Sequence, residues 1–187
     1  MKIQQILSIF IFSLSFVQLQ AQEDIPKGFK KGSITLFDKT VLTGYVKENI
    51  RSNASIVFLN EDTKKKKNYD GDGLVSITID SNHYICIKGD FFKVLCTGSL
   101  SLLQKSSDAS NKPSYNGSEA IFSSGTIGKP GDYLIFDNTS SQLRLIPKNN
   151  LDREVAQNFS SCPDAIDKTK TAKKVFIPVK DVMVAQN

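Results

Sequence analysis

The sequence predicts an α+β fold: a mainly antiparallel β-sheet or partial barrel, followed by three short C-terminal helices. Between residues 32 and 146, short segments of alternating apolar and polar residues are separated by turn-forming residues, a pattern typical of strands. Beyond Pro147, apolar residues recur at three- and four-residue spacing, which favours helices. We therefore expect residues 22–187 to form a single β-rich domain whose helical segment covers about 149–187.

Residues 1–21 have the pattern of a secretory signal peptide. Lys2 provides a positive start, an almost unbroken apolar run covers 6–17, and Ala21 offers a small residue for cleavage. The run is shorter than the roughly 20 apolar residues that a membrane-spanning helix needs. We expect cleavage after Ala21 and a location in the cell envelope, secreted or periplasmic, with no transmembrane segment in the mature chain. An uncleaved anchor is the alternative.

The charge balance gives no sign of a nucleic-acid partner. The chain has 24 basic and 19 acidic residues, a formal net charge of +5 at pH 7. This excess is mild and spread along the chain, whereas a nucleic-acid surface gathers its basic residues. We expect no nucleic-acid partner.

Strands are predicted in order along the first half of the chain. Residues 32–37 and 41–48 are expected to pair as a hairpin across a short polar turn. A third strand is expected at 55–59, and residues 74–80 alternate cleanly as a fourth. The intervening residues 60–73 are charged and contain glycine, and are expected to form a loop.

The sheet is expected to be organised around one long strand at residues 91–103. It exceeds the usual three to ten residues, so we expect a bend or bulge at Gly98. Residues 83–88 should lead into it through a two-residue turn formed by Gly89 and Asp90. Alternation then points one row of residues into the core: Phe92, Val94, Cys96, Gly98, Leu100 and Leu102.

The rest of the predicted sheet is a hairpin formed by residues 133–136 and 142–146. The polar residues 105–119 are expected to form a mobile loop, and residues 120–122 a short strand at best. The three helices are expected at 151–159, at 163–169 and after Pro178.

Three cysteines in an exported chain suggest a disulfide, with one left over. The expected turn places His83 opposite Cys96, and Cys86 on the other face of the sheet. A Cys86–Cys96 bond would need both Cβ atoms on one side, so we expect none. Cys96 is instead expected to be a buried apolar residue. Whether a disulfide forms with Cys162 is left open.

His83 and Cys96 are the candidates for catalysis. His83 is the only histidine, so a hydrolase or thiol enzyme of the usual kind would need it as the base for its nucleophile. No Gly-x-Ser-x-Gly motif is present. A strand-end histidine beside a structural cysteine is the more ordinary interpretation, and a hydrolase or thiol enzyme using the pair is the alternative.

Two loop motifs are candidates for binding. Lys64, Lys65, Lys66 and Lys67 create a local positive potential that could attract anionic sugars or lipid headgroups, although such runs are usually solvated.

Residues 68–73 copy the first half of a calcium loop, with Asn68, Asp70 and Asp72 as oxygen ligands. Position twelve holds Ile79 in place of a glutamate, so an ordinary Asp-Gly turn is favoured over calcium and no metal is expected. No phosphate loop or dinucleotide motif is present, and no cofactor is expected.

Three stretches resemble a broad, uncharacterised group of exported β-rich Bacteroidota proteins. Residues 31–38 and 42–46 are similar to the opening hairpin of that group, residues 92–102 to its central strand, and residues 159–163 to the motif that closes its helical end. The resemblance implies export and a β-rich architecture, but no activity. Together these observations predict an exported, non-enzymatic binding or structural module that contacts a protein, glycan or lipid surface through its sheet edge or loops.

Overall fold

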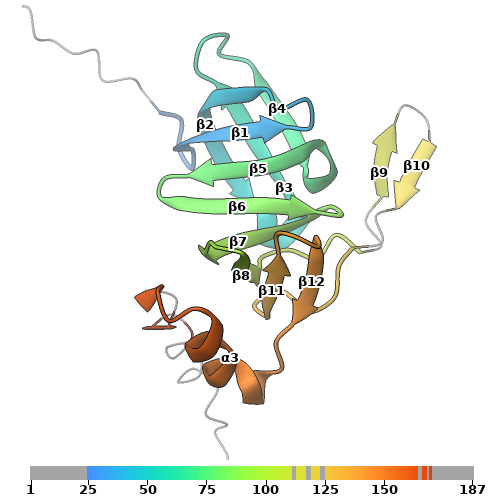
Figure 1. The fold of residues 1–187 in the computed structure, drawn as a ribbon. Coiled ribbons are helices and arrows are strands. Elements are labelled where there is room, and N and C mark those ends of the chain that lie inside the picture. The colour runs from blue at the N-terminus through green and yellow to red at the C-terminus, as the bar shows by residue number, and fades with distance from the viewer. Residues whose placement is uncertain are drawn as a thin grey trace, which may run out of the picture.

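Figure 1 shows a computed structural model of the protein, in which ten strands form one antiparallel sheet. The structure describes residues 25–110, 113–116, 119–122, 125–163, 166–167 and 169. The expected signal peptide and the expected helix after Pro178 lie outside these residues. The strand order is β12-β11-β8-β7-β6-β5-β1-β2-β3-β4, so β12 and β4 form the two edges of an open sheet.

The first half of the sheet contains the predicted opening hairpin and the strands that follow it. Its strands are β1 (Lys30–Leu36), β2 (Val41–Asn49), β3 (Ser55–Asn60), β4 (Lys66–Asp70) and β5 (Leu74–Ile79). A short helix, α2 (Ile50–Asn53), joins β2 to β3, and a 3-10 turn, η2 (Gly71–Gly73), joins β4 to β5. Strand β4 lies in the segment 60–73 that was expected to be a loop, so that expectation is wrong for its second half. The pattern missed it because β4 lies at the sheet edge, where its side chains are mostly exposed and no apolar alternation is required.

The second half contains β6 (Asn82–Ile87), β7 (Asp90–Cys96), β8 (Leu100–Lys105), β11 (Tyr133–Asp137) and β12 (Gln142–Leu145). A separate two-stranded hairpin, β9 (Pro113–Asn116) and β10 (Glu119–Phe122), lies between β8 and β11 in the chain. The sequence predicts one continuous loop over residues 105–119, and this prediction is wrong. Lys105 ends β8, and residues 113–116 pair with β10.

The segment expected to be one long central strand is a hairpin. Strands β7 and β8 pair antiparallel, and the exposed residues Thr97, Gly98 and Ser99 turn the chain between them. The single-strand prediction is wrong because apolar residues alternate on both sides of this turn, so the pattern alone cannot distinguish a bend from a reversal. In place of the bend expected at Gly98, the chain makes a hairpin turn and reverses its direction.

A bulge at Leu95 also changes the row of core residues. Val94 lies opposite Leu103, whereas Cys96 lies opposite Leu102. The extra residue turns the following side chains to the other face of the sheet. Val94 therefore packs with the opposite face from Cys96, and the expected single row is wrong at this point.

The turn between β6 and β7 lies one residue earlier than expected. Ile87 pairs with Asp90, so Lys88 and Gly89 form the turn, with φ values of 48° and 81°. Positive φ at both central residues is what a tight two-residue hairpin turn with the right-handed strand twist requires. This register places Tyr84 opposite Lys93. His83 is therefore not opposite Cys96.

Three apolar cores stabilise the sheet. Core 1 fills one face of the first half and extends onto β6 and the start of β7, and core 2 fills the same face of the rest of the second half, beneath the C-terminal helix. Core 3 lies on the other face of the second half. The buried residues include Ile34, Val46, Ile56, Phe58, Ile77, Tyr84 and Phe91 in core 1; Cys96, Leu102, Tyr133, Ile135, Leu151, Val155 and Phe159 in core 2; and Phe92, Leu103 and Leu134 in core 3.

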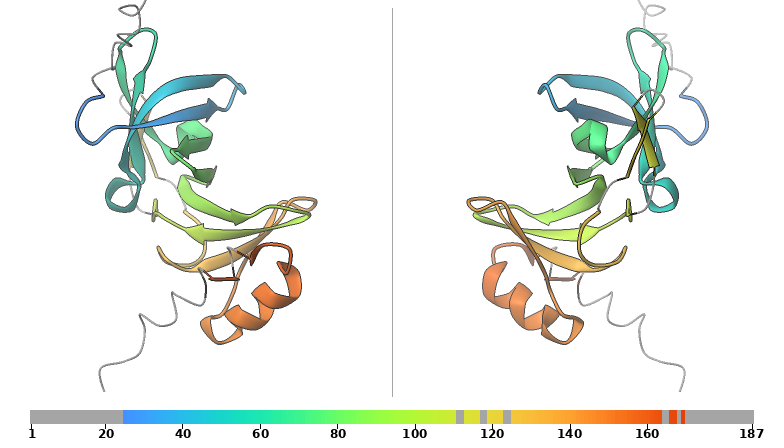
Figure 2. Two further views of the ribbon diagram at one scale, coloured as in Figure 1. Left: turned by 90° about the vertical axis from the view of Figure 1, so that its left-hand side faces the viewer. Right: turned by 90° about the vertical axis from the view of Figure 1, so that its right-hand side faces the viewer.

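Among the described residues, one C-terminal helix is complete. The prediction of three C-terminal helices is therefore wrong, and the structure supports one. Helix α3 (Leu151–Asn158) follows a short 3-10 turn, η3 (Lys148–Asn150). It buries Leu151 and Val155, with Phe159 just after its end, as the four-residue spacing predicts. In Figure 2, α3 lies against the part of the sheet formed by the second-half strands, away from β1 to β4. The expected helix at 163–169 is described only in part.

Candidate functional site

One row of directly paired residues crosses six strands and connects core 1 to core 2. Residues that face each other across an antiparallel pair place their side chains on the same face of the sheet. The row therefore lies on one face, here named the first face. It runs through Ile34, Ile77, Tyr84, Lys93, Gln104 and Tyr133. Its middle is polar, although both ends lie in apolar cores.

A cleft of about 250 Å³ opens over this polar middle. Tyr84, Lys93 and Gln104 reach it from β6, β7 and β8. Glu48 comes from the end of β2, and Arg51 from α2. Lys105, Ser106, Pro130 and Gly131 complete the lining, and we call Pro130 and Gly131 its rim. We name this hollow the Lys93 cleft.

The polar side chains of the Lys93 cleft have few partners within the protein. Among the residues that the structure describes, Arg51, Lys93 and Gln104 make no ion pair or side-chain hydrogen bond. Lys93 and Gln104 are nevertheless half-buried. Half-buried polar groups are normally paired, because removing them from water costs free energy. These groups are thus available to a ligand.

Tyr84 adds a neutral hydroxyl to the cleft. Its side chain is 6% exposed. Burial, and to a smaller extent the nearby Glu48 carboxylate, which repels the phenolate, raise the pKa of Tyr84 to about 12. The hydroxyl therefore stays protonated at neutral pH, so it can both donate and accept a hydrogen bond.

Lys105 contributes backbone to the cleft, but its charge is used elsewhere. Its Nζ lies 2.9 Å from Asp90 Oδ2, and both side chains are fully buried. The same Nζ donates to the carbonyls of Thr126 and Gly128 at 2.8 and 3.1 Å. Gly131 N–H also donates to the Lys105 carbonyl at 2.8 Å. This network holds the rim in place and removes Lys105 as a cation available to a ligand.

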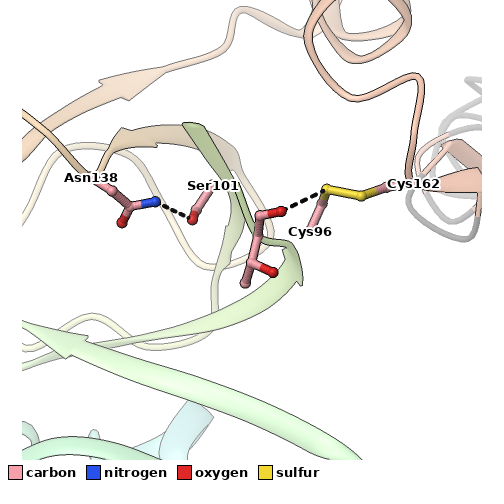
Figure 3. The surroundings of a disulfide bond; sticks show 5 residues. Cys96, Ser101, Asn138 and Cys162 are labelled. Atoms are coloured by element: carbon pink, nitrogen blue, oxygen red, sulfur yellow. Dashed lines mark hydrogen bonds between the residues drawn. A yellow bond between two sulfur atoms is a disulfide. The ribbon is translucent and has the colours of Figure 1, made fainter. Parts of the chain in front are cut away.

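The structure does not bring His83 and Cys96 together. His83 is exposed, and its Nδ1 lies 3.3 Å from Thr78 Oγ1 on the neighbouring strand β5. Cys96 is bonded to Cys162, as Figure 3 shows, with a Cα–Cα distance of 6.1 Å. A disulfide sulfur cannot serve as a thiolate nucleophile. Cys96 is buried, as expected, and the pairing that the sequence left open is with Cys162.

Cys86 is the free cysteine, and no Cys86–Cys96 bond forms, as expected. Contrary to the predicted register, Cys86 and Cys96 lie on the same face of the sheet. The bulge at Leu95 returns Cys96 to the same face as Cys86, but Cys86 lies opposite Phe91, at the other end of β7. Burial raises the pKa of the Cys86 thiol, and Asp72 and Asp70 raise it further. Cys86 therefore stays protonated and packs against core 1.

The four lysines do not form one cationic cluster. Lys64 lies in a turn with φ of 54°, whereas Lys66 and Lys67 lie on the edge strand β4. Successive strand residues point to opposite faces. Lys66 Nζ lies 5.4 Å from the Phe29 ring centroid and Lys67 Nζ lies 4.8 Å from that of Tyr69. Lysines on an edge strand also discourage pairing with a second sheet. Their binding to an anionic surface stays a prediction.

The proposed calcium ligands have local structural roles. Asp70 Oδ1 accepts a hydrogen bond from Gly73 N–H at 3.1 Å and so caps η2. Asn68 precedes it on β4. Burial is the main cause of a raised pKa at Asp72, and repulsion from the Asp70 and Asp90 carboxylates adds to it. Within the described ranges, no group of three His, Cys, Asp or Glu side chains is arranged to hold a metal ion.

The chain matches no protein-family model, no curated protein and no solved structure. No helix in the described part of the chain is both long and apolar enough to cross a membrane. The function must therefore be inferred from the cleft and the disulfide. Sequence reasoning did not identify the cleft. The available signal was the presence of Lys93 and Gln104 within an otherwise apolar stretch.

Proposed function

We propose that this protein is an exported, non-enzymatic binding module that holds a small polar ligand in the Lys93 cleft. The observation that carries this proposal is the convergence of unpaired polar side chains on one hollow between two apolar cores. Arg51, Lys93 and Gln104 come from three different elements, and within the described residues none makes a side-chain hydrogen bond.

The size of the cleft supports a small ligand. Its volume of about 250 Å³ lies just below the range of roughly 300 to 1,000 Å³ that is typical of ligand pockets. A single sugar ring or a molecule of similar size suits such a volume. The lining of donors, acceptors and charges suits recognition by hydrogen bonds.

The chemistry of the cleft supports binding over catalysis. Tyr84 keeps its proton at neutral pH, so it is a hydrogen-bonding group and a poor base. The alternative, a hydrolase or thiol enzyme, would use His83 and Cys96. His83 lies outside the residues that line the cleft, and Cys96 is in a disulfide.

The disulfide supports an extracytoplasmic location. Bonds such as Cys96–Cys162 form and persist in oxidising compartments. Together with the predicted signal peptide and the resemblance to exported Bacteroidota proteins, this favours a secreted or periplasmic protein of the cell envelope. A module in that setting would meet sugars and other small molecules released from cell surfaces.

The test is a titration of the ¹⁵N-labelled mature chain, observed by NMR, with three probes of one size: D-glucose, D-glucosamine and D-glucuronate. The proposal expects at least one probe to give saturable shifts at Tyr84, Lys93 and Gln104. Lys47→Gln, an exposed change on β2 that does not line the cleft, should leave these shifts unchanged. Absence of saturable cleft shifts with all three probes would overturn the proposal.

A further inference from the structure

We infer that the ligand of the Lys93 cleft carries a carboxylate, which Arg51 and Lys93 bind together. This inference rests on the proposed function and names its ligand class. The charges that line the cleft do not balance. Arg51 and Lys93 are positive and Glu48 is negative, whereas Lys105 is neutralised by Asp90. One positive charge therefore has no counterpart in the lining.

Lys93 is the residue that most needs a partner. It is half-buried on the first face, between Tyr84 and Gln104 in the cross-strand row. Lysine is rarely withdrawn from water unless a carboxylate or another acceptor compensates for it. Among the described residues no carboxylate lies within ion-pair distance of its ammonium. An anionic ligand would provide that compensation.

Arg51 is placed to complete the same site. It lies on α2, which follows β2, and β2 is separated from β7 in the sheet by β1, β5 and β6. Arg51 and Lys93 nevertheless line one cleft. A guanidinium presents parallel N–H donors that match the two oxygens of a carboxylate. A ligand between α2 and β7 can thus receive donors from both residues.

The remaining groups favour hydroxyls on the same ligand. The Glu48 carboxylate accepts hydrogen bonds, the Tyr84 hydroxyl can donate or accept, and the Gln104 amide does both. A simple carboxylate such as acetate would leave these groups unused. A hydroxylated carboxylate of one ring, with D-glucuronate as the chemical type, would use all of them.

The test compares D-glucuronate with D-glucose, which differ at C6 by the carboxylate, using isothermal titration of the mature chain. We expect glucuronate to bind about tenfold or more tightly than glucose, with an affinity that falls as salt is added. Arg51→Gln and Lys93→Gln should each weaken glucuronate binding by about tenfold and leave glucose binding nearly unchanged. Lys47→Gln removes the same charge outside the cleft and should have no effect.

A charge reversal keeps the test independent of a simple loss of folding. Lys93→Glu, in a variant that melts as the wild type does, should lose glucuronate and bind D-glucosamine more tightly than the wild type. Equal affinity for glucose and glucuronate, unaffected by Arg51→Gln or Lys93→Gln, would overturn the carboxylate inference but leave the proposed function standing. Absence of cleft binding by all three sugars would overturn both.

Discussion

Asp90 and Lys105 form a fully buried ion pair that joins the first residue of β7 to the last residue of β8, with Oδ2 and Nζ 2.9 Å apart. The carboxylate also accepts hydrogen bonds from the backbone N–H groups of Ala109 and Thr126, at 2.7 and 2.8 Å. The hydroxyls of Ser107 and Thr126 donate to it as well. One carboxylate therefore ties both ends of the segment between β8 and β11 to the sheet.

Removing one charge of this pair should be strongly destabilising. Lys105→Met leaves the Asp90 carboxylate buried without its cation, which typically costs about 3 to 5 kcal/mol. Urea denaturation measures the loss. Glu154→Gln is the control, because it breaks the partly exposed Arg144–Glu154 pair and should cost far less. Equal losses for the two variants would contradict the structural role of Asp90.

The stability of the protein should depend on reductant. Cys96 and Cys162 are 66 residues apart, and a disulfide closing a loop of this length stabilises by about 4 kcal/mol in the chain-entropy description. Dithiothreitol should lower the melting temperature of the wild type. Cys96→Ser should melt at the same temperature with and without reductant, whereas Cys86→Ser should retain the wild-type sensitivity. A wild type that is insensitive to reductant would exclude the Cys96–Cys162 bond.

The β7–β8 hairpin predicts that stability depends on Leu102 and not on Ser99. Leu102 is fully buried in core 2, so Leu102→Ala should cost about 2 to 5 kcal/mol. Ser99 is exposed in the turn, and Ser99→Ala should change stability by no more than about 0.5 kcal/mol. Denaturant melts of the two variants test the hairpin. A large loss for Ser99→Ala would return this segment to a continuous strand.

Gly71 should not tolerate a side chain. A Cβ at this position would lie against the Gly89 carbonyl oxygen, where η2 packs on the β6–β7 turn. Gly71→Ala should therefore destabilise by about 1 to 3 kcal/mol, because backbone must move to relieve the contact. Gly98→Ala is a suitable control, since its nearest atom, the Leu100 carbonyl oxygen, lies 3.3 Å from the added carbon. Thermal melts in which both variants behave alike would contradict this packing.

Tyr84 should make stability fall at high pH. The pKa of its phenol is raised from 10.0 to about 12 in the folded protein, by burial and then by Glu48. The unfolded chain therefore loses this proton at lower pH than the folded chain does. The resulting stabilisation is complete below pH 10 and is lost as pH rises from about 10 to about 12. Denaturant melts across this window should show a smaller decline for Tyr84→Phe, and an identical decline would refute the shifted pKa.

Local patterns were sufficient to predict much of the architecture. The β1–β2 hairpin follows from the apolar alternation and from its turn, where Asp38 Oδ1 accepts a hydrogen bond from Thr40 N–H at 2.9 Å. Helix α3 follows from the four-residue spacing of Leu151, Val155 and Phe159. Each of these signals depends on residues within a few positions of one another, so the sequence is enough to identify them.

The site and the exact pairing depend on contacts between distant residues. The Lys93 cleft combines side chains from β2, α2, β6, β7 and β8, and the sequence did not indicate that these side chains meet. Asp90 binds Thr126, and Cys96 binds Cys162, across long stretches of chain. The bulge at Leu95 decides which face Cys96 occupies. Alternation fixes faces only up to a bulge or a reversal, because one extra residue turns every later side chain to the other face. Composition and periodicity therefore establish the sheet and α3, whereas the cleft, the disulfide and the buried ion pair arise from the register in which the strands meet.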